Sequence, residues 1–271
     1  MPNPARDLTA RSEFPWWLVV AIALAAVAAV AIFASDLYSQ VFSTVAKGIG
    51  ITVVVTVVSF AFAAAIGLGI ALMALSGSAW LRQSARLYVE IIRGIPILVL
   101  LFWIAFAGVP AFVAGWNFLT AGLQEAGLLG ALQVRDVPLL WRAVLALMIG
   151  YSPFIAEIFR AGIQSVDPGQ IEAAKALGLS RYRRFRHIVM PQAIRTILPP
   201  LGNDFIALVK DSSLVSVLGV ADITQMGKIY AAGSFRFFET YSIVAYIYLI
   251  LTVGLSIALR ALERRLRRAR G

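Results

Sequence analysis

The stretch GITVVVTVVSFAFAAAIGLGIALMAL, Gly50–Leu75, contains no charged residue and is long enough to cross a membrane as one helix. A hydrocarbon layer about 30 Å thick needs roughly 20 apolar residues at the helical rise. Small residues recur in this stretch at helical spacing, at Ala63, Gly67 and Ala71. Such residues let two helices approach closely in lipid, where packing drives association. The stretch therefore predicts a membrane-spanning helix with one closely packed face.

The whole chain shares this apolar character. Hydrophobic residues make up 60% of its 271 residues and charged residues only 14%, which excludes an ordinary soluble domain of this length. The absence of cysteine excludes disulfides and cysteine-ligated metals, and the single histidine, His187, leaves little for any metal site. The net charge of +10 comes from basic residues that flank apolar stretches, so we expect no nucleic-acid partner.

Six stretches approach the length of one membrane crossing. They are Trp16–Ala34, Gly50–Leu75, Ile95–Trp116, Leu139–Phe159, Pro199–Val220 and Tyr241–Leu259. The sequence thus predicts an all-α integral membrane protein with six transmembrane helices in a single membrane domain. The first stretch has a second interpretation, a cleaved signal peptide ending near residues 31–35, although its apolar run is longer than the usual signal core.

The basic residues indicate which side of the membrane each connecting segment occupies. With a cytoplasmic amino terminus, the segments 1–15, 76–94, 160–198 and 260–271 lie on one side and hold 18 of the 24 Lys and Arg residues. This asymmetry predicts that both termini are cytoplasmic. The six arginines of the tail 260–271 are expected to contact anionic lipid headgroups.

The connector between the fourth and fifth stretches carries the signals of a short helix outside the membrane. Asp167 suits the N-cap, Pro168 suits the first helical position, and Gln170 stands where a capping box places Glu or Gln. Helix-forming residues follow over 171–177, and Gly178 is expected to end the helix in a left-handed conformation. These signals predict a helix of two to three turns.

A second short segment is expected directly after this helix. Ser180 can cap the residues 181–189, and Pro191 is expected to end them before the fifth stretch begins. The first of the two helices is rich in small side chains and offers little bulk. Its shape fits a groove on a partner, and a soluble motor protein would transmit force to the membrane helices in this way.

Four separated motifs carry a family resemblance. They read YVEIIRGIP at 88–96, AEIFRAGIQSV at 156–166, EAAKALG at 172–178 followed by Met190-Pro191, and VKDSSL at 209–214. Together they resemble the binding-protein-dependent ABC transporter permeases, in particular their polar amino-acid (histidine/glutamine) branch. The resemblance covers about 48–259 and implies a type I ABC importer permease fold, a five-helix core plus the added N-terminal helix 16–34. Methionine stands at position 190, where the family often has leucine.

The resemblance also implies the partners and the docking residues. The loop would dock on an ATP-hydrolysing subunit through Glu172, Ala173, Ala174, Gly178 and Pro191. The chain has no phosphate-binding GxxxxGK[ST] loop, so ATP and Mg would lie on that partner, and the chain itself would hold no cofactor and be no enzyme. The implied assembly contains an ABC ATPase dimer, an extracytoplasmic solute-binding protein and a second permease subunit, identical or different. It would work by alternating access in a bacterial inner membrane.

Charged residues inside the fifth stretch are candidates for a substrate pathway. A charge at the bilayer centre costs about 2.5–3.5 kcal/mol on insertion scales and therefore needs a partner or a water-filled path. Two prolines and a glycine in the same stretch predict a bent or interrupted helix. The polar groups either line the pathway or pair with one another and with a neighbouring subunit. They are Asn203, Asp204, Lys210 and Asp211.

Two further charge pairs are spaced three residues apart on helices, Glu90 with Arg93 and Glu157 with Arg160. They form part of a gate or anchor helix ends at the interface. An ion-coupled secondary transporter is the alternative function, because it also uses broken helices and intramembrane charge. A membrane-integral enzyme is a weaker alternative, since the chain lacks a recognisable catalytic constellation.

Overall fold

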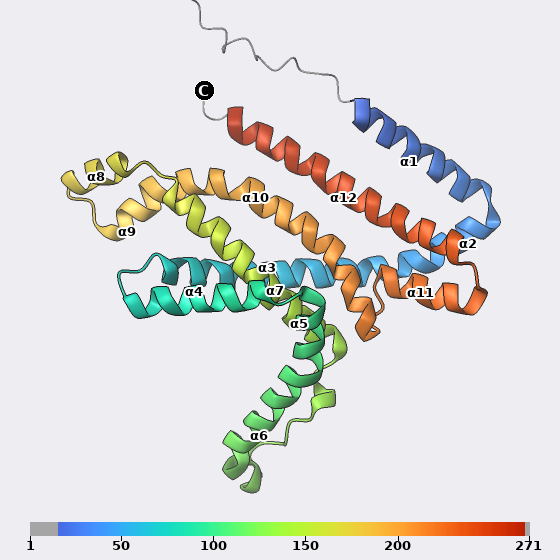
Figure 1. Cartoon of the computed structure of the whole chain (residues 1–271), viewed down its shortest axis with the longest axis horizontal. Coiled ribbons are helices and arrows are strands. Elements are labelled where there is room, and N and C mark those ends of the chain that lie inside the picture. Colours follow the sequence, from blue (N-terminus) through green and yellow to red (C-terminus); the bar gives the residue numbers. More distant parts are fainter. Residues whose placement is uncertain (1–15, 269–271) are drawn as a thin grey trace, which may run out of the picture.

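The computed structural model describes residues 16–268, and in this part of the chain every regular element is a helix, which confirms the all-α class (Figure 1). The predicted tail 1–15 and the last residues of 260–271 lie outside the described part. The α-helices are α1 (Trp16–Ala34), α2 (Asp36–Val45), α3 (Ile49–Ala74), α4 (Ala79–Gly94), α5 (Ile97–Trp103), α6 (Val109–Glu125), α7 (Leu139–Gln164), α8 (Pro168–Ala176), α9 (Arg181–Arg184), α10 (Met190–Asp211), α11 (Ile223–Ser234) and α12 (Phe237–Arg268).

Four helical runs among the described residues are long and apolar enough to cross a membrane. They are Asp36–Ala74, Ile97–Glu125, Leu139–Gln164 and Phe237–Arg264. The first expected span, α1, contributes the shorter apolar helix Ile22–Ala34, and the fifth, α10, falls outside this group because it contains several charged residues. The exact count of six spans therefore stays a prediction, while the central apolar helices are present.

The core forms where α3 and α7 pack along each other. Ala63 and Ala71 are fully buried in this contact, and a Cβ atom on Gly67 would lie 2.9 Å from the carbonyl oxygen of Ser152 on α7. The close helix contact predicted from these small residues is thus present. Leu147 and Ile155 of α7 are also fully buried, so α7 is the helix around which the others are arranged.

The segment 76–94, which was expected on the cytoplasmic side, contains a packed helix, α4. Helix α4 folds back along α3 (Figure 1). Its buried residues Ala85 and Val89 pack against Ile70 of α3 and Ala156 of α7. The apolar residues of this face recur only every three to four positions, with charged residues of the other face between them. The sequence of α4 therefore contains no continuous apolar run.

A second unit packs α2, α11 and α12 together near the far end of α3. The fully buried Asp222 caps α11 by accepting a 2.8 Å hydrogen bond from the amide of Gln225, and its other oxygen accepts one from Tyr248 of α12. The amide of Ile223 donates to Thr52 of α3. Since the backbone of Gly48 lies against Asp222, a Cβ at position 48 would clash with that backbone. Neither α2 nor α11 was expected.

Helices α5 and α6 form an arm that leaves the α3–α7 core (Figure 1). They are joined by one π-helical turn, Ile104–Gly108. The buried Arg142 of α7 fixes this joint by donating hydrogen bonds to the carbonyl oxygens of Ala105, Val134 and Val137. The arm is therefore fastened to the core at its base.

Candidate functional site

Helix α8 projects from one end of the molecule, beyond the ends of α7 and α10 (Figure 1). Its first turn is capped as predicted, since the Asp167 carboxylate accepts a 2.8 Å hydrogen bond from the amide of Gly169 and Pro168 occupies the first turn. Its end is a Schellman motif: Gly178 has φ +71°, its amide donates to Lys175, and the amide of Leu179 donates to Ala174. Local sequence thus fixes both ends of the projection.

The predicted capping box does not form. The side chain of Gln170 instead accepts a hydrogen bond from Gln192 of α10. The Asp167 side chain already satisfies an amide of the first turn, and Gln192 offers a donor from the neighbouring helix. This hydrogen bond ties α8 to α10.

The second short helix does not end at Pro191. The helical run continues from Arg181 to Asp211 through one π-helical turn, Phe185–Val189, and Pro191 lies in the first turn of α10. Proline in a helix interior lacks a donor and crowds the carbonyl of the preceding turn, and a widened turn just before it gives room. The segment that follows α8, from Arg181 onward, is therefore one helical run with α10.

The exposed surface of α8 differs from the expected docking surface at one residue. Glu172 and Ala173 are exposed, but Ala174 is 3% exposed and packs inward. Leu177, directly before the terminal glycine, is 80% exposed. The sequence analysis did not include Leu177 in the docking surface. Its position directly before the helix stop was a usable signal, because the turn at the C-cap points its side chain outward.

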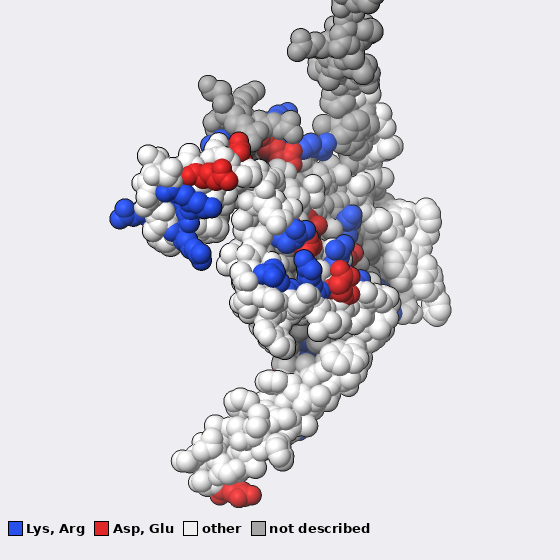
Figure 2. Space-filling model, turned by 60° about the vertical axis from the view of Figure 1, so that its left-hand side comes forward, with Lys and Arg blue, Asp and Glu red and all other residues white. Residues whose placement is uncertain are grey.

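Charged residues gather at the same end of the molecule. Figure 2 shows Lys and Arg side chains over the projection and over the neighbouring ends of the core, whereas the α6 arm is uncharged until its tip. The sequence of α6 has Glu125 as its single charged residue. In α9 three of four residues are arginine, at positions 181, 183 and 184. This end is therefore suited to a polar environment and the arm to an apolar one.

A pocket of about 410 Å³ lies between α7, α10 and the break between α4 and α5. Asp204, Asp211 and Arg93 contribute the charged groups of its wall. The hydroxyl of Tyr151 donates a 2.7 Å hydrogen bond to Asp211. Oδ2 of Asp204 is buried and has no hydrogen-bond partner among the described residues. The pocket thus brings together two of the predicted residues of the fifth stretch and one residue of a predicted charge pair, Arg93.

The other two polar residues of the fifth stretch lie elsewhere. Lys210 is exposed and does not line the pocket, and Asn203 lines a different pocket beside Glu263 of α12. Helix α10 also continues through Pro199 and Pro200, where a bent or interrupted helix was expected, so the helix is not interrupted there. The neighbouring Gly202 lets α10 and α12 pack closely, since a Cβ at this position would clash with the side chain of Leu259 of α12. The change of helix type comes later, at the 3₁₀ turn Ser212–Leu218.

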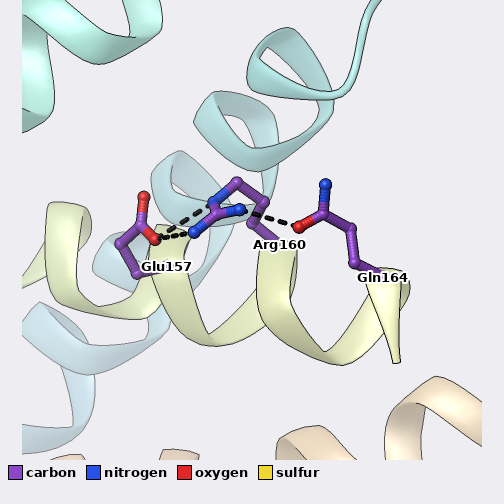
Figure 3. A network of polar contacts seen from close by, with 3 residues as sticks. All are labelled: Glu157, Arg160 and Gln164. Atoms are coloured by element: carbon purple, nitrogen blue, oxygen red, sulfur yellow. Dashed lines mark hydrogen bonds and ion pairs between the residues drawn. The ribbon is translucent and has the colours of Figure 1, made fainter.

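Of the two predicted charge pairs, the structure forms one. Arg160 donates to Glu157, with Nε 3.0 Å from Oε2, and to Gln164 at 2.7 Å (Figure 3). Glu90 and Arg93 form no ion pair among the described residues. The Arg93 guanidinium instead lies 5.2 Å from the centre of the Phe154 ring, because α4 packs beside α7 and offers an aromatic face at that point. Among the described residues there is also no group of three or more potential metal ligands.

Four long apolar helices, a capped helix held outside the core and a pocket with charged residues fit the class of transporter permease subunits. The comparison with known families is specific. Residues 63–268 match the family described as "binding-protein-dependent transport system inner membrane component", and the chain belongs to this family. Its members are transmembrane subunits whose ATPase is a separate subunit, so the chain is a permease subunit and not an enzyme.

Two relatives of the chain are named as amino-acid permeases. The glutamine transport system permease protein GlnP of Escherichia coli K12 is 41% identical over 69% of this chain and 77% of its own length. The probable amino-acid permease protein YxeN of Bacillus subtilis 168 is 38% identical over 68% of this chain and 74% of its own.

Solved structures agree. A structure titled "Crystal structure of an amino acid ABC transporter with histidines" matches with a TM-score of 0.68 and 37% identity, covering 86% of this chain and 98% of that one. The inward-facing MetNI methionine transporter, at 21% identity and a TM-score of 0.62, supports the fold alone. The type I ABC importer permease fold is thereby confirmed.

Proposed function

We propose that this chain forms the transmembrane pathway of an ATP-driven importer of polar amino acids. The relatives named for amino-acid and glutamine transport support the substrate class. The observation that carries the proposal is helix α8, a capped helix held outside the core and linked to α10 by the hydrogen bond between Gln192 and Gln170. A helix built in this way can receive a push from a soluble partner and pass it to the core.

In the proposed cycle, α8 docks on an ABC ATPase subunit, which binds ATP and Mg. Glu172, Ala173 and the exposed Leu177 form the contact, together with the exposed Gly178 and Pro191, while the buried Ala174 supports it from within the loop. When two ATPase subunits close, the projections of two permease subunits approach, and α10 moves with them. The pathway then opens outward, and hydrolysis returns it to the inward state.

The assembly includes a second permease subunit, identical or different, and an extracytoplasmic solute-binding protein. It lies in the bacterial inner membrane with both termini cytoplasmic, as the basic residues at the α8 end support. The membrane domain spans 48–259 with the coupling loop 160–198, the added helix 16–34 packs outside it, and the arginines of 260–271 contact lipid headgroups. An ion-coupled secondary transporter is not favoured, because such a protein needs no docking helix.

The test uses the purified permease–ATPase complex with its solute-binding protein. Gly178→Asp places a side chain at φ +71°, which strains the helix stop and adds a charge beside the docking surface. We expect solute-stimulated ATP hydrolysis to fall at least about tenfold, as a positive-φ non-glycine residue costs on the order of 1–2 kcal/mol before any charge effect.

Gly127→Asp is the matched control. Gly127 has φ +70° and ends α6 with the same pair of hydrogen bonds, but it lies at the tip of the arm. It carries the same backbone strain without touching α8, so coupling should be retained. Equal ATPase stimulation in wild type and Gly178→Asp, with the two subunits still associated, would remove α8 from the docking role.

A further inference from the structure

A groove of about 380 Å³ lies between α1 and α12, away from the pocket at α4, α7 and α10. All of its lining residues are apolar except Tyr246, whose hydroxyl donates a 3.3 Å hydrogen bond to the carbonyl oxygen of Ala25. This hydrogen bond joins the two helices at one point. Small residues keep the rest of the space open, namely Ala26 and Ala29 on α1 and Gly254 on α12.

The surroundings of Gly254 show that the groove is not filled by the described part of the chain. This glycine is exposed, and a Cβ atom at its position would meet nothing within 4 Å. Both helices belong to predicted membrane spans, 16–34 and 241–259, so the medium around the groove is lipid rather than water. Water does not fill an apolar space of this kind. An acyl chain fills it and contacts two helices at once, which gives more dispersion attraction than one flat helix surface.

The groove ends at a basic stretch of α12. Arg260 and Arg264 follow the lining residue Ile257 by three and seven residues, so they continue the lining face toward the end of the helix. Arg264 is exposed, and Nε of Arg260 donates to the carbonyl oxygen of Ser256. Since α1 and α12 lie side by side and run in opposite directions, α1 begins at this same end, with the exposed Trp16 (Figure 1). Tryptophan and arginine at helix ends are typical of the headgroup level of a membrane.

The balance of charge at this end of the groove is positive. Helix α1 has no charged residue. Glu263 is the acidic residue in this stretch of α12, but it falls on a different face from Ile257 and lines the pocket beside Asn203 of α10. Arg260 also lines that pocket, whereas Arg264 lies one helical turn farther along the groove face. An occupant with an apolar chain and an anionic head therefore matches both parts of the site.

We propose that the α1–α12 groove binds one anionic phospholipid of the cytoplasmic leaflet, with an acyl chain along Ala29 and Gly254 and the phosphate at Arg260 and Arg264. Basic pockets between membrane helices on the cytoplasmic side bind anionic headgroups. The lipid holds the added helix α1 against α12. The inference gives the lipid contact proposed for 260–271 a defined site. It rests on the proposed orientation but not on transport, so its failure leaves the importer proposal intact.

The experiment is native mass spectrometry of the full-length chain, purified in detergent and titrated with dioleoyl-phosphatidylglycerol or dioleoyl-phosphatidylcholine. The two lipids share their acyl chains and their phosphate, but the choline cation neutralises the second one. We expect phosphatidylglycerol to bind at least about tenfold more tightly, because one charge-assisted contact is worth about that factor. Arg260→Gln combined with Arg264→Gln should lower its affinity to that of phosphatidylcholine.

Gly254→Leu tests the acyl-chain half of the site. The new side chain occupies the groove without meeting protein atoms, since the space beside Gly254 is open. We expect both lipids to bind at least about tenfold more weakly, because about two methylene groups lose their buried position. Gly69→Leu is the matched control. Gly69 is also exposed with nothing within 4 Å of its Cβ position, but it lies on α3 and does not line the groove.

Arg181→Gln combined with Arg183→Gln is the matched control for charge, because it removes two exposed arginines from α9. Both controls should bind the two lipids as the wild type does. Equal affinity of the wild type for the two lipids overturns the inference. So does a preference for phosphatidylglycerol that persists in the double variant of Arg260 and Arg264. Unchanged lipid binding in Gly254→Leu also overturns it, and if a dimer of the chain dissociates in that variant, a second copy occupies the groove instead.

Discussion

At the scale of single residues, two glycines on α3 allow the effect of helix packing on stability to be compared with the effect of helix propensity. A Cβ on Gly67 would lie 2.9 Å from Ser152 O and from Ile155 Cγ2, both on α7, whereas a Cβ on Gly69 meets nothing within 4 Å. Gly67→Ala should lower stability by about 1–3 kcal/mol, because α3 and α7 must separate. Gly69→Ala should be neutral or stabilising by up to about 1 kcal/mol. The thermal unfolding midpoints of the two detergent-purified variants test this, and equal midpoints would contradict it.

The same scale shows what the sequence determines. Asp167 and Gly178 were identified correctly because a cap and a left-handed stop depend on neighbours within a few residues. The capping box of Gln170 and the Glu90–Arg93 ion pair do not form, because the partners of Gln170 and Arg93 come from α10 and α7. The docking role of Ala174, which packs inward, stays a prediction. Asp204 and Asp211 were chosen as charges in an apolar stretch. That they line a pocket while Lys210 does not could be seen only once the packing of the helices was known.

At the scale of elements, Arg142 determines how the α5–α6 arm is held. It is 8% exposed, and its guanidinium serves three backbone carbonyls at the arm's base and in the segment that returns to α7. Arg142→Met keeps an apolar stem but leaves those carbonyls without their donor, so we expect a loss of about 2–5 kcal/mol.

Limited proteolysis within 126–138, together with the unfolding midpoint, measures the effect. The exposed Arg135 lies in the same segment, and Arg135→Met should change stability by less than about 0.5 kcal/mol. Similar cleavage of the two variants would show that the arm is held by other contacts. The sequence could not supply this role, since the partners of Arg142 include a carbonyl of the π-helical turn, which lies far from it in the chain.

At the scale of the whole molecule, charge and apolar surface divide it into two ends. The basic residues gather at the α8–α9 end, and the tip of the α6 arm lies far from it (Figures 1 and 2). Leu177 on the projection is 80% exposed and Leu128 beyond α6 is 75% exposed, so each position accepts a reporter. The natural chain has no cysteine, so a single introduced thiol is read without background.

The positive-inside distribution predicts that these two positions face opposite sides of the membrane. In right-side-out membrane vesicles, an impermeant maleimide should label Leu128→Cys directly and Leu177→Cys only after permeabilisation. Inverted vesicles should give the reverse pattern, which controls for differences in thiol reactivity. Labelling of both positions from one side would place the projection and the arm tip in the same compartment. If that compartment were the exterior, an ATPase acting from the cytoplasm could not reach α8, and the coupling mechanism would fail with the orientation.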